Sequence, residues 1–198
     1  MSDCVGDALS CPWSEREAEL LAITLELLQE HGYDRLNVEA VATKAKASKA
    51  TLYRRWPSKA DLVLAAFIEG TRPEVVVPQT GSLREDLLVI GAQVCEHAAA
   101  HAPTMRAVLN EIVRSPALTD AFHTGFIDQR HQMVMAVLHN AVDRGEIDAE
   151  AINDEIWAVL AGYLVFRLLL PVSPPTAETV RALVDEVMMP SLLRTRTG

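Results

Sequence analysis

The first part of the chain, up to residue 70, shows apolar residues at the three- and four-residue spacing of helices. Ser14 and Glu17 form a capping box before the first run, and Gly32 ends that run. Asn37 and Ser48 are good N-caps for the two short helices that follow. The pattern predicts helices over residues 14–32, 37–45, 48–56 and 58–70.

The rest of the chain repeats the helical spacing in longer segments. A connector that contains Pro73, Pro78 and Gly81 separates it from the first part. We expect Pro103 to break the helix that begins at Ser82. Helices are predicted over residues 82–101, 105–114, 118–144 and 148–170 and from residue 176 onwards. The predicted fold class is therefore all-α, with about nine helices.

The chain is expected to contain an N-terminal arm and two domains. The arm covers residues 1–13, the first domain residues 14–72 and the second domain residues 73–198. The longest strongly apolar stretch, Ile156–Leu170, contains Arg167 and is shorter than the ~20 residues that a membrane span needs. The first residues include two acids and lack the basic and apolar regions of a secretory signal. We therefore expect a cytoplasmic protein without a membrane partner.

Charge is segregated along the chain. The net charge of −9 argues, taken alone, against a nucleic-acid partner. All four lysines nevertheless fall between Lys44 and Lys59, together with Arg54 and Arg55, and no acid interrupts this basic window. A compact basic patch on an acidic protein is typical of contact with a polyphosphate through one small surface.

The basic window overlaps a helix-turn-helix pattern over residues 37–56. Packing of the first short helix against the core leaves the start of the second free to enter a major groove. The residues then placed to reach base edges or phosphates are Lys49, Thr51, Tyr53 and Arg54. The small Ala50 allows close approach, and backbone N–H groups at Ser48 and Ser58 add donors for phosphate. The alternative is that the six cations form only a solvated face.

The same segment resembles the N-terminal domain of the TetR family of bacterial transcriptional regulators. The resemblance covers residues 14–70 and includes Leu27, Gly32, Tyr33, Val38, Glu39, Val41 and Ala42, followed by AKASKATLYRRWPSKADLVLAAF. Its most specific part is S-K-x-T-L-Y-x-x-W-x-S-K-x-x-L, at residues 48–62. In the family, the tyrosine and second lysine of this motif clamp phosphates, which implies that role for Tyr53 and Lys59. The resemblance implies a dimeric repressor that a small-molecule effector releases from a palindromic operator in double-stranded DNA.

The turn departs from the family at Lys46, where most members have glycine. Either this turn avoids positive φ, or Lys46 carries strain. Ala50, often glycine in relatives, should stiffen the recognition helix slightly. The complete set of expected DNA-binding residues is Lys46, Ser48, Lys49, Ala50, Thr51, Tyr53, Arg54, Ser58 and Lys59.

A helix is predicted over residues 148–170 with Asp148 as its N-cap, and its part Ile156–Leu170 is apolar on nearly all sides. A small domain has one core to cover such a helix, so we expect a second subunit to cover the other face. A central helix in a monomeric bundle is the alternative. The last helix has the same apolar spacing and is the expected companion. The expected interface residues are Leu160, Leu164, Val180, Leu183, Val184 and Val187.

The second domain resembles one recurrent C-terminal type of the family more loosely, at residues 143–148, 163–171 and 173–187. By this resemblance, its large or adaptable side chains line an effector cavity. The candidates are Met105, Phe122, Phe126, Met133, Trp157, Tyr163 and Phe166. Each of them fits a plain core position equally well.

Other classes of function have weaker support. His97 and His101 have the spacing of metal ligands, but Ala98 stands where a zincin motif needs glutamate. A metal-responsive regulator and a helical dimeric binding protein without DNA binding remain as alternatives. The nearest glycines, Gly81 and Gly91, are too far apart for a phosphate-binding loop, and no serine lies in a nucleophile elbow. We therefore expect no enzymatic activity, no cofactor and no metal.

Overall fold

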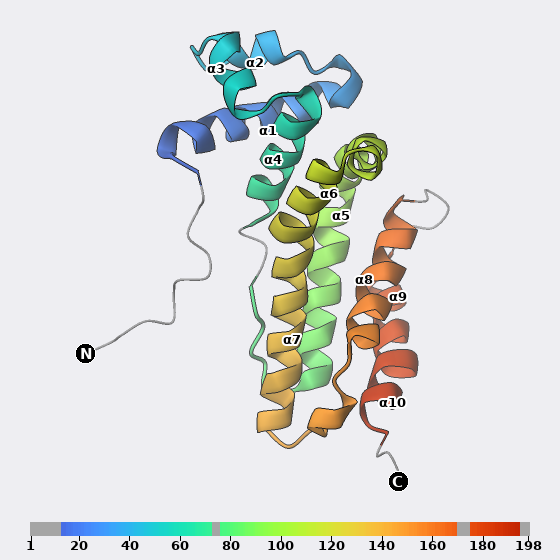
Figure 1. The fold of residues 1–198 in the computed structure, drawn as a ribbon. Helices are drawn as coiled ribbons and strands as arrows, with labels where there is room; N and C mark the ends of the chain where they lie inside the picture. The colour runs from blue at the N-terminus through green and yellow to red at the C-terminus, as the bar shows by residue number, and fades with distance from the viewer. Residues whose placement is uncertain (1–12, 73–75, 170–174, 195–198) are drawn as a thin grey trace, which may run out of the picture. The chain divides into compact units, whose positions relative to one another are not determined.

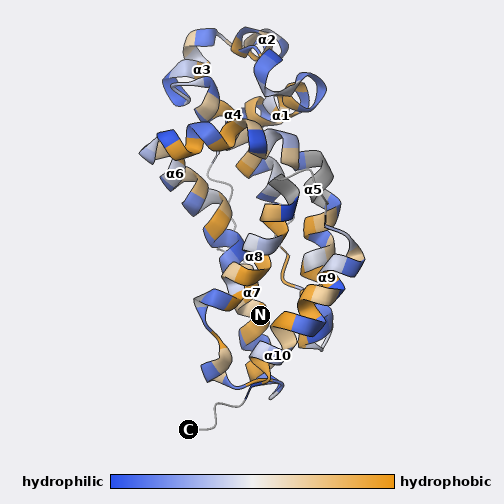
Figure 2. Cartoon of the chain, turned by 90° about the vertical axis from the view of Figure 1, so that its right-hand side faces the viewer, coloured by the Kyte–Doolittle hydropathy of each residue, from blue (hydrophilic) through white to orange (hydrophobic). Residues whose placement is uncertain are grey.

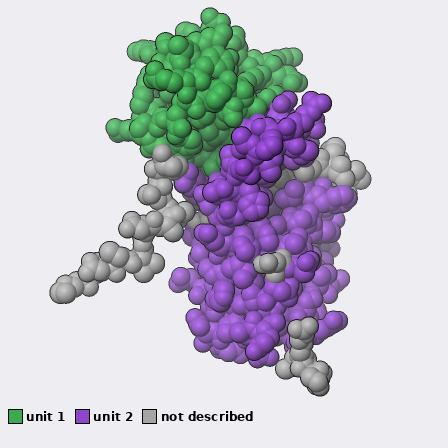
Figure 3. Space-filling model, in the orientation of Figure 1, with its two compact units in different colours: residues 1–70 green, residues 71–198 purple. Residues whose placement is uncertain are grey.

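The structure is a computed structural model that describes residues 13–72, 76–169 and 175–194. The chain divides into two compact units, residues 1–70 and 71–198 (Figure 3). All regular structure in the described residues is helical, which confirms the all-α fold class (Figure 1). The expected N-terminal arm lies outside the described residues, apart from Trp13.

The first unit is formed by α1 (Glu15–Arg35), α2 (Val38–Lys44), α3 (Lys49–Arg55) and α4 (Lys59–Thr71). The predicted N-caps of the first three helices are confirmed. The side chains of Ser14, Asn37 and Ser48 each accept a hydrogen bond from a backbone N–H in the first turn. Gly32 interrupts α1 at φ 77°, and a short helical piece continues to Arg35. Local capping thus determines where these helices begin.

The second unit packs α5 (Leu83–Arg114) against α6 (Pro116–Phe122), α7 (Asp128–Asp143), α8 (Asp154–Leu169) and α9 (Ala177–Leu183). The π-helical turn His123–Ile127 joins α6 to α7, and a second one, Val184–Met188, joins α9 to α10 (Met189–Leu192). The fully buried side chains of its core include Leu83, Leu87, Val134, Val137 and Leu138. No helix in the described part of the chain is both long and apolar enough to cross a membrane.

The expected break at Pro103 is wrong, because α5 continues through this residue. A proline inside a helix removes one backbone hydrogen bond and costs about 3 kcal/mol. The neighbouring residues Ala102 and Thr104 are both buried. The helix thus continues past the exposed proline with a buried residue on each side of it.

Two more helix boundaries differ from the prediction. Asp148 precedes only a short 3-10 turn, Ala149–Ala151. The side chain of Asn153 instead accepts the backbone N–H of Ile156 at 3.2 Å, at the start of α8. Both residues are good N-caps, and the apolar pattern alone does not choose between them. The segment predicted as one helix over residues 118–144 begins earlier, at Pro116, and contains a π-helical turn.

The expected dimer-interface residues lie mostly in the core of the second unit. Five of them are only 0–6% exposed: Leu160, Leu164, Val180, Leu183 and Val184. A side chain buried inside one subunit cannot also face a partner, so the expectation is corrected for these five. Val187 remains exposed. In a helix that is apolar on nearly all sides, apolar residues have the same spacing on every face. Periodicity therefore could not identify the face that packs inward.

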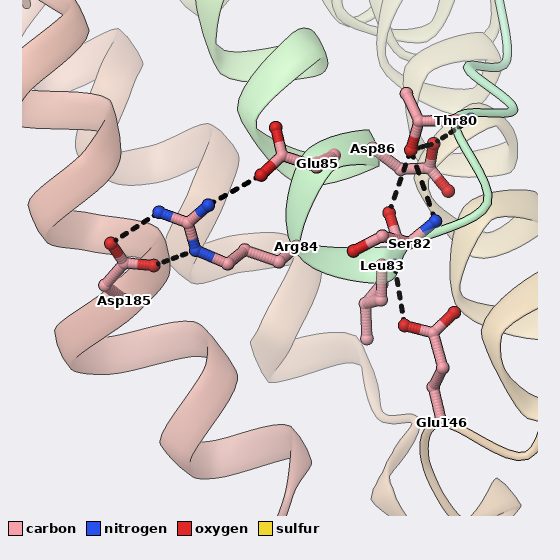
Figure 4. Close-up of polar contacts among 8 residues, drawn as sticks. All are labelled: Thr80, Ser82, Leu83, Arg84, Glu85, Asp86, Glu146 and Asp185. Atoms are coloured by element: carbon pink, nitrogen blue, oxygen red, sulfur yellow. Dashed lines mark hydrogen bonds and ion pairs between the residues drawn. The ribbon is translucent and has the colours of Figure 1, made fainter.

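A polar cluster connects the start of α5 to the segment after α7 (Figure 4). The carboxylate of Asp86 is 0% exposed and accepts hydrogen bonds from the backbone N–H and the hydroxyl of Thr80, at 2.8 and 2.7 Å. Arg144 donates to the same carboxylate at 3.3 Å. Glu146 accepts the backbone N–H of Leu83 at 2.8 Å and so caps α5 from a distant part of the sequence. The cluster joins two segments that lie far apart along the chain.

Candidate nucleic-acid interface

α3 separates its side chains into a core face and an outward face. Leu52 and Trp56, one turn apart, are both buried, as the spacing predicts. The exposed residues of the outward face are Lys49, Ala50, Tyr53 and Arg54. Thr51 is half-buried, and its backbone N–H and hydroxyl both bond to the hydroxyl of Ser48. The core face holds the helix in place, while the outward face presents two cations and a phenol.

The turn between α2 and α3 is a Schellman motif. The backbone N–H of Ala47 donates to the carbonyl of Ala42 at 2.8 Å, and that of Lys46 donates to the carbonyl of Thr43 at 3.1 Å. This motif needs one residue in the left-handed region, and Lys46 occupies it with φ 50°. The turn therefore does not avoid positive φ, and Lys46 carries the backbone strain.

A second Schellman motif, at the end of α7, shows which residue usually takes the left-handed position that Lys46 occupies. There the same two backbone hydrogen bonds form, and Gly145 takes the left-handed position at φ 73°. A residue with a Cβ in this region costs about 1–2 kcal/mol more than glycine. The exposed lysine thus adds a positive charge beside α3 at the expense of local stability.

The cations of the basic window differ in their partners. The Lys44 ammonium lies 2.8 Å from the carboxylate of Glu26, and Arg55 Nε lies 2.6 Å from that of Glu17. Both carboxylates belong to α1, so these pairs attach the helix-turn-helix to it. Within the basic window, which lies wholly in the described part of the chain, four cations form no ion pair with a carboxylate: Lys46, Lys49, Arg54 and Lys59. These four charges are available to a polyanion.

The tie between α1 and α3 depends on the ionised form of Glu17. The backbone N–H of Ser14, followed by the Arg55 guanidinium, holds the pKa of Glu17 below its ordinary value. A lowered pKa means that this contribution to stability is present at neutral pH and is lost as the pH falls through the lowered value. Arg16 connects α1 to the end of α2, because its guanidinium donates to the carbonyl of the C-cap residue Ala45.

The two capping serines are engaged with their own helices. The Ser48 hydroxyl accepts the backbone N–H of Thr51 at 3.0 Å. The backbone N–H and the hydroxyl of Ser58 both donate to the carboxylate of Asp61, at 2.9 and 2.6 Å. The N–H of Ser58 is therefore already satisfied, which corrects its expected role as a phosphate donor. The side chain of Ser48 fixes the start of α3, and that of Ser58 fixes the start of α4.

The expected effector residues occupy two kinds of environment. Met105 and Met133 are buried, and Phe122 and Phe126 stack with ring centroids 5.0 Å apart. Trp157 is half-buried with its ring 5.6 Å from that of His131. A pocket of about 360 Å³ lies instead between α1 and α4 of the first unit, and none of the expected residues lines it.

Two of the expected effector residues lie on the outside of the second unit. Tyr163 and Phe166 are 38% and 61% exposed and form, with Val159 at 36%, an apolar surface that we call the α8 face. Figure 2 colours the residues along α8 by hydropathy. These three positions repeat at i, i+4 and i+7, the spacing of one helix face. The buried residues of α8 have a similar helical spacing, so the sequence could not distinguish the exposed face from the buried one.

The alternative metal site gains no support from the described side chains. Among them, no group of three or more histidine, cysteine, aspartate or glutamate residues is placed to hold a metal ion. The side chain of His97 lies outside the described part of the chain.

Comparison with known proteins agrees with this geometry. Residues 20–66 match the family described as bacterial regulatory proteins, tetR family, and residues 77–187 match the tetracyclin repressor-like C-terminal domain. The chain is 60% identical over 183 residues to the HTH-type transcriptional regulator Rv1556 of Mycobacterium tuberculosis, which covers 92% of this chain and 91% of the relative. It is 34% identical over 176 residues to the DNA-binding transcriptional repressor TetR of Mycobacteroides abscessus, with coverage of 88% and 92%.

A solved structure supports the same assignment. The TetR family transcription regulator SCO0332 has a TM-score of 0.78 and 28% sequence identity, and the match covers 88% of this chain and 97% of that one. The two family matches include both the helix-turn-helix and most of the second unit. The chain therefore belongs to the TetR family of bacterial helix-turn-helix transcriptional regulators.

Proposed function

We propose that the protein represses transcription as a homodimer on a palindromic DNA operator, and that a small molecule bound in its second unit releases it. The observation that carries this proposal is the outward cationic face of the helix-turn-helix, with Lys46, Lys49 and Arg54. Regulators of this family bind DNA operators and small-molecule effectors and act as dimers. The relative from Mycobacteroides abscessus is named as a DNA-binding repressor. We propose no enzymatic role.

The proposed contacts with DNA follow from the positions of the side chains. Lys49 and Arg54 lie on the outward face of α3, where each can donate to a guanine edge, and Ala50 lets the helix approach closely. Tyr53 and Lys59 bind phosphates, which carry no sequence information. The remaining residues of the proposed interface are Lys46, Ser48 and Thr51.

The α8 face is the proposed contact between subunits. Its exposed valine, tyrosine and phenylalanine form an apolar surface of the kind that a symmetric dimer buries. A glycine in the same helix, Gly162, has open space beside it, so a neighbouring helix can come close. Val187, on the second π-helical turn, is the one exposed residue among the six that the sequence predicted at the dimer interface.

The buried and half-buried residues among the effector candidates are the proposed lining of the effector site. They are Met105, Phe122, Phe126, Met133 and Trp157. Their composition favours a largely apolar small molecule. Linkage requires the operator to weaken effector binding by the same factor by which the effector weakens operator binding.

The experiment that tests the DNA contact measures binding to duplex DNA at several salt concentrations. Lys59→Ala should weaken binding to all duplexes and reduce the slope of log affinity against log salt by about one for each lost phosphate contact, or about two per dimer. Lys49→Ala should also change the preferred sequence.

Lys44→Ala is the matched control. Lys44 lies in the same basic window but is already paired with Glu26. Its replacement should leave the salt slope nearly unchanged. An unchanged slope for Lys59→Ala would refute its assignment as a phosphate contact.

A further inference from the structure

The side chain of Lys59 is held by the end of α1. Its ammonium lies 4.5 Å from the ring centroid of Tyr33 and donates to the carbonyl oxygen of Asp34 at 3.4 Å. Both partners come directly after Gly32, whose φ of 77° and ψ of 167° turn the chain out of the helical path. This backbone conformation is essentially restricted to glycine. The glycine therefore makes possible the placement of the aromatic ring beside the lysine.

The two groups that hold Lys59 carry no net charge. Lys44 and Arg55 are held by carboxylates, which compensate their positive charge. An aromatic face and a carbonyl oxygen attract an ammonium group without neutralising it. Lys59 is thus oriented while its full charge stays available to a phosphate.

Lys59 has a particular need for such a support. It is the first residue of α4, where the positive end of the helix dipole disfavours a cation. A lysine also has a flexible four-carbon stem, and binding a phosphate would otherwise require this stem to be ordered. Orientation before binding reduces that entropic cost.

We propose that Tyr33 is a positioning residue for DNA binding, which holds the Lys59 ammonium in the place where a phosphate of the operator approaches. The proposal rests on the proposed function, because it requires Lys59 to contact phosphate. Tyr33 itself touches no DNA in this arrangement and acts through Lys59 alone.

The test is a double-mutant cycle in the full-length protein. Tyr33→Leu should weaken duplex binding by about five- to thirtyfold, because in each dimer two lysines lose the cation–π contact that orients them before they bind. The salt slope should stay the same, since no charge is removed. Tyr33→Phe keeps the aromatic face and should bind like the wild type. In a Lys59→Ala background, Tyr33→Leu should have no further effect. Tyr33→Met serves the same purpose if the leucine variant does not fold.

The outcomes separate this proposal from the proposed function. An equal loss in both backgrounds would show that Tyr33 acts through helix packing, and a loss for Tyr33→Phe would assign the effect to its hydroxyl; either result overturns the proposal. Normal binding by Tyr33→Leu, with weakened binding by Lys59→Ala, overturns this proposal and leaves the phosphate contact intact. Normal binding by Lys59→Ala would refute the phosphate contact and this proposal together.

Discussion

A Val159→Glu substitution is expected to yield folded monomers that no longer bind the operator. Val159 is exposed in the single subunit, so the charge should not disturb the core. In a dimer that buries the α8 face, the same carboxylate would lose its water without gaining a partner. Such a penalty of several kcal/mol raises the dissociation constant of the dimer at least about 100-fold. Sedimentation velocity measures the subunit association, and titration with duplex DNA measures the consequence.

Val113→Glu provides the matched control for this prediction. Val113 is 76% exposed on α5, so the substitution makes the same change on another apolar surface residue. This variant should remain dimeric and bind DNA normally. Leu164→Glu, at a buried position of α8, should instead unfold the second unit. A Val159→Glu protein that sediments as a dimer over the same concentrations would refute the proposed interface.

Asp86→Ala is expected to lower the free energy of unfolding by about 2–4 kcal/mol. The substitution leaves the backbone N–H and the hydroxyl of Thr80 without their acceptor and removes the carboxylate that Arg144 contacts. These groups lie around a fully buried position, where water cannot replace the lost oxygen atoms. Urea unfolding followed by circular dichroism measures the change.

The neighbouring residue Glu85 is the control for Asp86. Its carboxylate is exposed and pairs with Arg84 at the surface, so Glu85→Ala should change stability by no more than about 0.5 kcal/mol. Asp86→Asn keeps an oxygen for Thr80 but loses the charge that faces Arg144, and it should fall between the two. Equal stability of the two alanine variants would show that the buried cluster contributes nothing.

The helix-turn-helix could be predicted from the sequence because its determinants are local. Ser14, Asn37 and Ser48 each cap a helix by bonding to the first turn of that same helix. The inward position of Leu52 and Trp56 follows from helical spacing. The outward face of α3, which carries the proposed contacts with DNA, follows from the same spacing.

The features that sequence could not predict depend on contacts between distant residues. The pairing of Lys44 with Glu26 determines which cations remain available, and no local pattern indicates it. The position of Tyr33 beside Lys59 depends on how α1 meets α4. On α8, both faces are apolar, so the distinction between core and surface required the packing of the whole second unit.

The strain at Lys46 could be predicted only in part from the sequence. The sequence identified the unusual residue, but its φ of 50° follows from the backbone hydrogen bonds of the turn. A lysine in place of glycine was compatible with either a relaxed or a strained turn. The Schellman motif resolves the choice, because its geometry requires a left-handed residue.

Selection of bound sequences from a pool of random duplex DNA tests the central claim most directly. A dimer that inserts two copies of α3 into one face of the double helix should enrich a palindrome. The centres of its half-sites should lie one helical turn apart, about 34–36 Å, or a multiple of that distance. Recovery of sequences no different from the starting pool, at a protein concentration that retains DNA, would contradict sequence-specific recognition by this face.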